Sequence, residues 1–205
     1  MSKKIIITGG LGYIGTELCK IYSGISWNNE ILVIDNRFIS ERVNQLRNWG
    51  IKFVHGDILD SGLMKKHLID SDIVHHLAGI TQVSRTAKES NIKKDEKINQ
   101  VAVEGTQNVI SSIPNSCRII FPSTHVVFEG IQSTKKEILE DEPTSPILSY
   151  ATGKVNNEEQ LKNSGKKYVI LRLGSVYGYS TDTTRLDIMP NLFSKITSQN
   201  GLIKL

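Results

Sequence analysis

A glycine-rich turn near the amino terminus constrains the fold of this chain more than any other feature. The stretch Lys3–Gly15 reads KKIIITGGLGYIG, so three isoleucines lead into glycines spaced G-x-x-G-x-x-G. Such a β-branched run predicts a strand buried on both faces. Residues 13–22 then predict a helix with Ile14, Leu18 and Ile21 on its apolar face. A strand, a tight turn and a helix start in this order present free backbone N–H groups to a pyrophosphate.

A carboxylate, Asp35, follows the last glycine by about 20 residues and ends a second predicted strand, residues 31–34. In this position a carboxylate accepts hydrogen bonds from both hydroxyls of an adenosine ribose. Its negative charge repels the 2′-phosphate of NADP, so the sequence favours NAD, although Arg37 offsets part of that repulsion. The alternative is an ordinary βαβ unit with a glycine-rich turn.

Composition excludes several other classes of protein. The 205-residue chain has a net charge of +4, with 39% hydrophobic and 22% charged residues, as globular domains do. Its lysine pairs are not interleaved with aromatic residues, so nothing favours nucleic acid binding. No apolar run approaches the roughly 18 residues that a membrane helix needs. Two distant cysteines fit neither a disulfide framework nor a zinc site, and we expect a cytoplasmic protein without a metal.

Predicted strands and helices alternate along almost the whole chain. The strands are expected at residues 5–7, 31–34, 52–54, 73–77, 118–121 and 168–173, and the helices at 13–22, 42–49, 63–68, 91–113 and 149–161. This order predicts an α/β fold, a doubly wound parallel sheet with helices on both sides. The ligand is then expected at the carboxyl edge of the sheet, with the polar segment 130–142 as a loop near the active site.

Three side chains in the second half of the chain indicate proton chemistry: Thr124, Tyr150 and Lys154. Tyr150 and Lys154 are four residues apart, so they project from the same side of a predicted helix. An ammonium beside the phenol favours the phenolate and is expected to lower the pKa of Tyr150 from about 10 toward neutral pH. Thr124 follows a predicted strand, where its hydroxyl can bond a substrate oxygen. Taken alone, the pair could also be an exposed tyrosine beside a surface lysine.

Together, these motifs resemble the extended short-chain dehydrogenase/reductase family, in its NAD-dependent epimerase/dehydratase branch, which mostly handles nucleotide sugars. The matching segments follow the family's order and cover essentially the whole chain: Thr8–Gly15, Asp35–Asn36, Gly56–Ile58, His76–Gly79, Ser123–Phe128, Tyr150–Lys154 and Leu171–Gly178. The resemblance implies a Rossmann domain at residues 1–178 and the start of a substrate-binding lobe at residues 179–205. It also implies NAD as the cofactor and a nucleotide sugar as the small-molecule substrate, and it allows a homodimer.

Roles for single residues follow from the resemblance. Cofactor contacts are expected from Gly9, Gly12, Tyr13, Ile14, Gly15, Asp35, Asn36, Asp57, Ile58, Leu77, Ala78, Gly79, Tyr150 and Lys154. Tyr150 is the expected acid/base, with Thr124 and Lys154 assisting, while a hydride moves between a sugar carbon and NAD. His125, which follows Thr124, is a candidate substrate contact. His75 and His76 are expected to be packing or loop residues.

The sequence departs from the family pattern in its long helix, at Ser175, where an asparagine is common in the family, and in its length. The family usually has an asparagine three or four residues before its Gly-Thr pair, whereas Val101 and Ala102 precede Gly105–Thr106 here. Family members also generally continue well beyond this length, so we interpret the chain as a truncated member. Residues 187–193 then predict the first helix of the substrate lobe, and residues 201–205 the beginning of a strand.

Several functions remain open on the sequence. His125 stands where dehydratases of the family carry an acidic residue, which favours epimerisation or simple reduction. The run Ser-Thr-x-x-Val-Phe-x-Gly also resembles the deoxysugar reductases, which use NAD or NADP. A non-catalytic dinucleotide-binding module and a redox-sensing regulator of the same fold are the alternatives from other classes.

Overall fold

A six-stranded sheet in the order β3-β2-β1-β4-β5-β6 organises the chain, and every neighbouring pair of strands is parallel. The computed structural model describes residues 2–25, 28–81, 91–133, 137–180, 185–186 and 188–203. The strands are β1 (Lys4–Thr8), β2 (Glu30–Asp35), β3 (Lys52–His55), β4 (Ile73–His76), β5 (Arg118–Thr124) and β6 (Lys167–Leu173). The predicted doubly wound α/β fold is confirmed.

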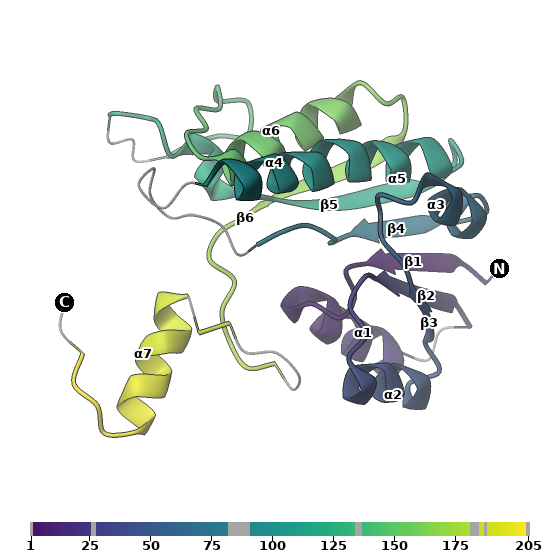
Figure 1. Cartoon of the computed structure of the whole chain (residues 1–205), viewed down its shortest axis with the longest axis horizontal. Coiled ribbons are helices and arrows are strands. Elements are labelled where there is room, and N and C mark those ends of the chain that lie inside the picture. Colours follow the sequence, from purple (N-terminus) through teal and green to yellow (C-terminus); the bar gives the residue numbers. More distant parts are fainter. Residues whose placement is uncertain are drawn as a thin grey trace.

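Helices cover both faces of the sheet (Figure 1). One face carries α1 (Tyr13–Gly24) and α2 (Ser40–Asn48), and the other carries α3 (Ser61–Leu68), α4 (Ile92–Gln100), α5 (Thr106–Ser112) and α6 (Ser149–Lys162). A 3-10 turn, η3 (His125–Phe128), follows β5, and α7 (Met189–Ser198) lies near the carboxyl end of the chain. The alternation of strands and right-handed crossovers brings the strand ends of β1, β2, β4 and β5 to one edge of the sheet.

Two hydrophobic clusters lie on either side of the sheet, and β1 contributes to both. Ile6 belongs to the cluster beneath α3, α5 and α6, whereas Ile5 and Ile7 belong to the cluster beneath α1 and α2. All three isoleucines are fully buried. Burying one such side chain stabilises a fold by about 1.5–3 kcal/mol. The short β-branched run therefore fixes β1 at the centre of the sheet, as the sequence predicts.

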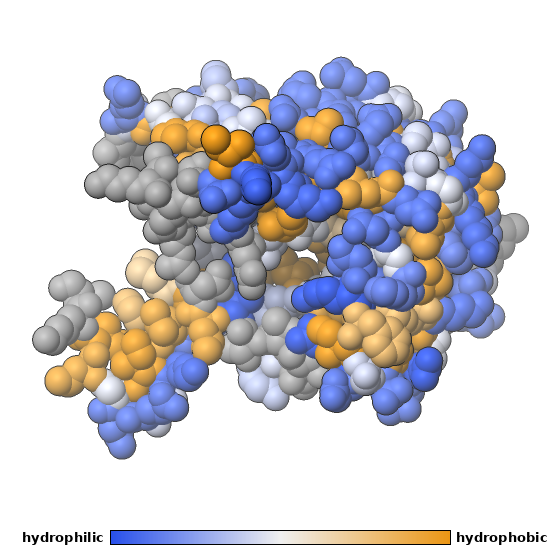
Figure 2. All heavy atoms as spheres, in the orientation of Figure 1, coloured by the Kyte–Doolittle hydropathy of each residue, from blue (hydrophilic) through white to orange (hydrophobic). Residues whose placement is uncertain are grey.

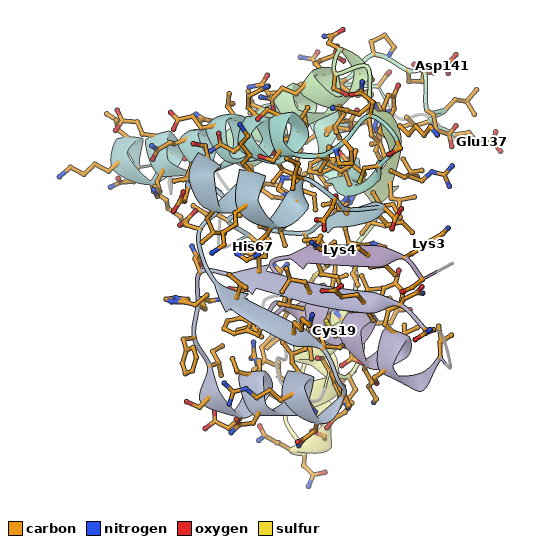
Figure 3. The ribbon with its side chains drawn as sticks, turned by 90° about the vertical axis from the view of Figure 1, so that its right-hand side faces the viewer. Lys3, Lys4, Cys19, His67, Glu137 and Asp141 are labelled. Carbon is orange, nitrogen blue, oxygen red and sulfur yellow. The ribbon has the colours of Figure 1, made fainter. Side chains whose placement is uncertain are left out.

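The buried face of α1 differs from the one expected. Ile14 and Ile21 are 37% and 60% exposed, so the predicted apolar face is wrong at these positions. The buried residues are Gly15, Thr16 and Cys19, and Figure 3 labels Cys19 between α1 and the sheet. Small side chains at these positions let the helix lie close against the sheet, whereas Leu18, the third residue of the predicted face, is partly buried against the hydrophobic cluster.

The predicted helix at residues 91–113 is present but is not uniform. A π-helical turn, η2 (Val101–Gly105), joins α4 to α5, and the helical run ends one residue before Ile113. A Cβ atom at Gly105 would lie 2.4 Å from Cδ1 of Ile58, so a side chain here would require the Ile58 side chain to move. Single π turns inside helices occur frequently at functional sites.

The carboxyl-terminal segment extends away from the sheet. Figure 1 places α7 apart from the other helices, and Figure 2 shows apolar side chains on its surface. Asn191 of α7 accepts, at its Oδ1, a hydrogen bond of 2.9 Å from the Gly178 N–H, which connects the helix to the segment that follows β6. Residues 201–203 are not part of a strand, so the strand predicted there is not found; residues 204–205 and Asp187 lie outside the described residues. Within the described part, no helix is long and apolar enough to cross a membrane.

Candidate active site

The glycine turn after β1 connects three strand ends. Gly9 has a positive φ of 72°, and its N–H donates to the Ile34 carbonyl at 2.8 Å. A Cβ atom at Gly9 would lie 2.7 Å from the backbone N of Ala78, in the loop that follows β4. Because both the backbone angle and the close contact exclude a side chain, position 9 requires glycine.

The first turn of α1 has the features of an anion-binding site. Gly12 is its N-cap and provides no side-chain cap. The first N–H groups of a helix have no partner within the helix and carry a partial positive charge. Those of Tyr13, Ile14 and Gly15 are therefore directed out of the helix start, beside the carboxyl edge of the sheet. A Cβ at Gly15 would lie 2.6 Å from the Gly9 carbonyl oxygen, so this glycine also permits the close packing.

Asp35, at the end of β2, lies directly beside the glycine turn. Its side chain is 3% exposed, and its Oδ2 accepts a hydrogen bond from the Leu11 N–H at 3.0 Å. Its Oδ1 accepts one from the backbone N–H of Arg37 at 2.9 Å, and the Arg37 guanidinium forms an ion pair with the same carboxylate. Asp35, the residue predicted to bind the ribose, therefore lies beside the glycine turn, but its carboxylate already has hydrogen-bond partners within the chain.

Asn36, Asp57 and Ile58 form the outer part of the same edge. The Asn36 amide donates to the Asp57 carboxylate at 3.0 Å, which joins the ends of β2 and β3. The Ile58 side chain is only 5% exposed and belongs to the hydrophobic cluster beneath α5. Its carbonyl accepts a hydrogen bond from Asn108 of α5, a contact that the sequence did not suggest.

The loop at residues 77–79 is held against β1 by a buried polar network. The Ala78 N–H donates to Oγ1 of Thr8 at 3.3 Å, and the same hydroxyl is hydrogen-bonded to Nδ1 of His76 at 2.8 Å. Nε2 of His76 is 3.0 Å from Oγ1 of Thr106 on α5. Burial lowers the pKa of His76 to about 3, so the imidazole is neutral. Its expected packing role therefore includes positioning the residues predicted to line the cofactor, Leu77, Ala78 and Gly79.

The three predicted catalytic residues occur on two adjacent elements. Thr124 ends β5 with 8% of its surface exposed, and Tyr150 and Lys154 lie on α6, which packs against β5. Nζ of Lys154 donates to the Pro122 carbonyl at 2.7 Å and lies 5.8 Å from the centroid of the Tyr150 ring. His125 is exposed, and its Nδ1 is 3.2 Å from the Leu173 carbonyl.

Burial dominates the titration of the tyrosine and the lysine. It lowers the pKa of Lys154 to about 8 and raises the pKa of Tyr150 above its ordinary value. The expected lowering of the Tyr150 pKa by Lys154 is therefore wrong for this state of the protein. The ammonium is directed at the Pro122 carbonyl, and the cation that lowers the pKa of Tyr150 in part is Arg185.

Glu158 of α6 and Arg172 of β6 form an ion pair that the sequence did not indicate. Glu158 is one helical turn beyond Lys154, is 1% exposed, and forms two hydrogen bonds with Arg172 of β6, at 2.7 and 3.0 Å. The Ser123 hydroxyl donates to the same carboxylate. Although burial by itself raises the pKa of Glu158, the hydrogen bonds from Arg172 and Ser123 bring it below its ordinary value. The i to i+4 spacing from Lys154 was the one available signal.

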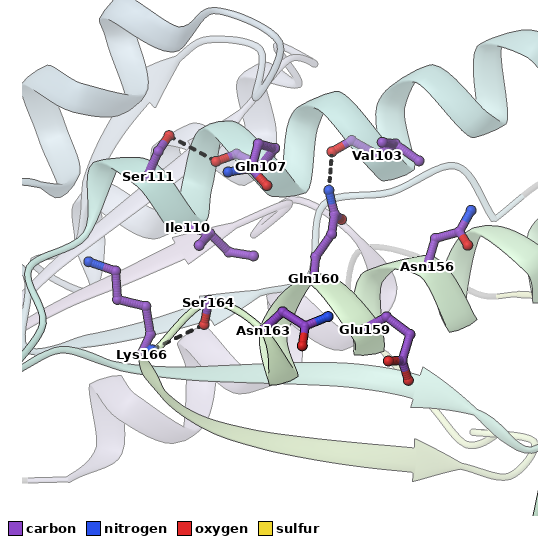
Figure 4. A pocket seen from close by; sticks show the side chains of 10 residues that line it. All are labelled: Val103, Gln107, Ile110, Ser111, Asn156, Glu159, Gln160, Asn163, Ser164 and Lys166. Carbon is purple, nitrogen blue, oxygen red and sulfur yellow. Dashed lines mark hydrogen bonds between the residues drawn. The ribbon is translucent and has the colours of Figure 1, made fainter.

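A groove of about 690 Å³ lies elsewhere, between α5 and α6. None of the predicted site residues lines it (Figure 4). The Gln160 amide spans it and donates to the Val103 carbonyl at 2.9 Å. It belongs to the helical layer and not to the carboxyl edge of the strands, where ligands of such folds bind. Among the described residues, no group of three or more histidine, cysteine, aspartate or glutamate side chains could hold a metal ion.

The residues present fit a dinucleotide. Glycines stand where a Cβ atom would fill the turn, an uncapped helix start follows, and a buried carboxylate lies beside them. This combination on a parallel sheet defines a dinucleotide-binding α/β protein. A model of the NAD-dependent epimerase/dehydratase family matches residues 5–205. The chain belongs to this family, and the predicted membership is confirmed.

Known members similar to the chain include both epimerases and dehydratases. It is 29% identical to a UDP-glucose 4-epimerase of Lactobacillus helveticus, over 97% of this chain and 61% of that protein. It is also 29% identical to a dTDP-D-glucose 4,6-dehydratase of Dictyostelium discoideum, over 86% of this chain and 44% of that protein. The structure of a UDP-glucose 4-epimerase from Brucella ovis in complex with NAD has a TM-score of 0.71 and 26% identity, over 88% of this chain and 55% of that one. The chain thus spans less than two thirds of the length of these relatives.

Proposed function

We propose that the chain supplies the cofactor-binding and proton-transfer part of a NAD-dependent enzyme that epimerises or dehydrates a nucleotide sugar. The observation that carries this proposal is the junction of the glycine turn with two further strand ends. Gly9 bonds the end of β2 through Ile34, and Thr8 bonds the loop after β4 through Ala78. These contacts build one continuous edge, next to which Thr124 and Tyr150 lie on β5 and α6.

Each part of this edge has a role toward NAD. The N–H groups of Tyr13, Ile14 and Gly15 would hold the diphosphate. Asp35 and Asn36 would hold the adenosine ribose, Asp57 and Ile58 would border the adenine, and Leu77, Ala78 and Gly79 would line the middle of the cofactor. Tyr150 and Lys154 would contact the nicotinamide ribose. With NAD bound, the nicotinamide accepts or returns a hydride.

The chain's own part in the reaction is to move a proton at Oη of Tyr150. The Tyr150 phenolate accepts the proton of the sugar hydroxyl and, as the phenol, returns it later, while the Thr124 hydroxyl hydrogen-bonds the same sugar oxygen. Because the pKa of Lys154 is about 8, the lysine carries its charge at neutral pH. Its ammonium would favour the phenolate during that transfer once it turns from the Pro122 carbonyl toward Tyr150. Return of the hydride to the opposite face gives epimerisation, and elimination before its return gives dehydration.

The segment 179–205 would begin the lobe that binds the nucleotide sugar. Its support is the position of α7, which lies apart from the sheet and carries exposed apolar side chains, Met189 and Leu192, with 66% and 38% of their surfaces exposed. The homodimer and the cytoplasmic location stay predictions. So does the preference for epimerisation or reduction, which depends on His125.

Binding and turnover test the proposal separately. NADH fluorescence should change on titration, and UDP-, dTDP- and GDP-sugars should be assayed for turnover. Tyr150→Phe should keep NADH binding and lose about 10²- to 10⁴-fold in turnover, as the removal of a general acid/base does. The matched control is Tyr168→Phe, at an exposed tyrosine on β6, which should leave both unchanged.

Three other outcomes would change the conclusion. Binding of NADH without turnover of any sugar would make the chain a non-catalytic dinucleotide-binding module. Turnover that survives Tyr150→Phe would disprove the acid/base role. Failure of folded protein to bind NADH would refute the proposed function as a whole.

A further inference from the structure

The adenosine-ribose end of the site contains an ion pair instead of a lone carboxylate. Nε of Arg37 is 3.2 Å from Oδ1 of Asp35, and its Nη2 is 3.4 Å from Oδ2. The two partners differ in exposure: the side chain of Asp35 is 3% exposed and that of Arg37 is 49% exposed. The carboxylate is thus fixed, whereas the guanidinium can move into solvent.

The acceptor sites of the Asp35 carboxylate are all occupied by donors within the chain. A carboxylate offers about four lone-pair sites. The donors on Asp35 are the backbone N–H groups of Leu11 and Arg37 together with Nε and Nη2 of the Arg37 guanidinium. Two ribose hydroxyls can therefore bond the carboxylate only after the guanidinium has moved away from it.

The guanidinium also lies over the glycine turn. A Cβ atom built on Gly12 would be 3.7 Å from Nη2 of Arg37. A second guanidinium, that of Arg42, donates to the Leu11 carbonyl of the same turn. Two cations and one buried anion, Asp35, therefore surround the place of the adenosine ribose. A guanidinium binds phosphate through paired N–H groups, so this end suits a phosphorylated ribose as well as a free one.

We propose that Arg37 gives the site dual specificity, so that it binds the 2′-phosphorylated dinucleotide NADP(H) as well as NAD(H). NAD(H) uses Asp35, whose carboxylate accepts the ribose hydroxyls once the guanidinium has moved aside. NADP(H) uses Arg37, whose guanidinium bonds the 2′-phosphate and neutralises the carboxylate behind it. This inference rests on the proposed dinucleotide function of the same site.

Titrations with NADH and NADPH test the inference without any need for turnover. For the unaltered chain, we expect both nucleotides to bind with dissociation constants within about tenfold of each other. Arg37→Gln should weaken NADPH binding by at least about tenfold, the loss of one charge-assisted hydrogen bond, and should leave NADH binding unchanged or tighter. Added salt should weaken NADPH binding more than NADH binding.

Two controls separate this effect from a general loss of charge or fold. Arg47→Gln removes an exposed arginine from the last turn of α2 and should alter neither affinity. Adenosine 2′,5′-bisphosphate and adenosine 5′-monophosphate isolate the ribose end, and only the first should lose affinity in Arg37→Gln. Circular dichroism would verify that both variants fold.

The possible outcomes test the dual specificity separately from the proposed function on which it rests. If NADH binds and NADPH binds more than about tenfold more weakly, a difference of about 1.4 kcal/mol, the dual specificity is wrong and the proposed function stands. Equal weakening of both nucleotides by Arg37→Gln would show that Arg37 only supports the fold, which also overturns the inference. If folded protein binds neither nucleotide, the inference and the proposed function both fail.

Discussion

Removing Arg172 should destabilise the protein by the energy of an uncompensated buried charge. Its partner Glu158 has a side chain that is 2% exposed, and Arg172 itself is 16% exposed. In Arg172→Met the carboxylate keeps only the Ser123 hydroxyl as its partner from this network. Breaking a buried ion pair from one side costs about 3–5 kcal/mol. The free energy of unfolding at neutral pH should fall by that amount.

The pH dependence of this loss is the sharper part of the prediction. In the unaltered chain the pKa of Glu158 is below its ordinary value, so the pair's stabilisation is present above the pKa of the unfolded glutamate and is lost as the pH falls through the folded pKa. In Arg172→Met, burial without the cation raises the pKa of Glu158. The penalty then applies above that raised pKa and is relieved by protonation in acid. The difference between the two proteins should therefore shrink from about pH 7.5 to about pH 5.

Urea unfolding followed by circular dichroism at both pH values measures this difference. The matched control is Arg118→Met, at an exposed arginine on the first residue of β5, which should change the unfolding free energy by about 0.5 kcal/mol or less. A loss under about 1 kcal/mol for Arg172→Met would refute the assignment of a buried, paired carboxylate. A loss that stays constant between the two pH values would refute the electrostatic explanation.

Three further predictions concern the turn, the histidine and the lysine. Gly15→Ala should abolish NADH binding and lower the thermal midpoint because its Cβ meets backbone atoms at 2.6 Å, whereas Gly24→Ala, with nothing within 4 Å, should be neutral or stabilising. Thr106→Val should cost about 1–3 kcal/mol in urea unfolding because one nitrogen of His76 loses its buried partner. Burial keeps the pKa of Lys154 at about 8 instead of 10.5, so stability should rise with pH above 8; urea midpoints should show that this rise disappears in Lys154→Met.

The sequence predicts those parts of the fold and of the site that depend on residues close together along the chain. The isoleucine run, the glycine spacing and Asp35 specify β1, the turn and the end of β2 within about 35 residues. The contacts that the sequence did not indicate depend instead on which strands and helices become neighbours in the fold. His76 forms hydrogen bonds with Thr8 and Thr106, which are 68 and 30 residues away in the sequence. No local spacing of residues predicts such a contact. The apolar face of α1 was misread for a related reason, since close packing of small residues is a property of the helix and sheet together.

Two buried polar networks flank the candidate site, and both join strand ends to the helices on one face of the sheet. His76 joins the ends of β1 and β4 to α5, and Glu158 joins β5 and β6 to α6 through Ser123 and Arg172. Apolar packing of the same volume is often equally stable. Hydrogen bonds differ in that they fix the direction as well as the distance between partners. Proton transfer requires donor and acceptor within about 2.6–3.2 Å, so a site built across the ends of β1, β2, β4 and β5 benefits from contacts that hold three of those ends, β1, β4 and β5, in place.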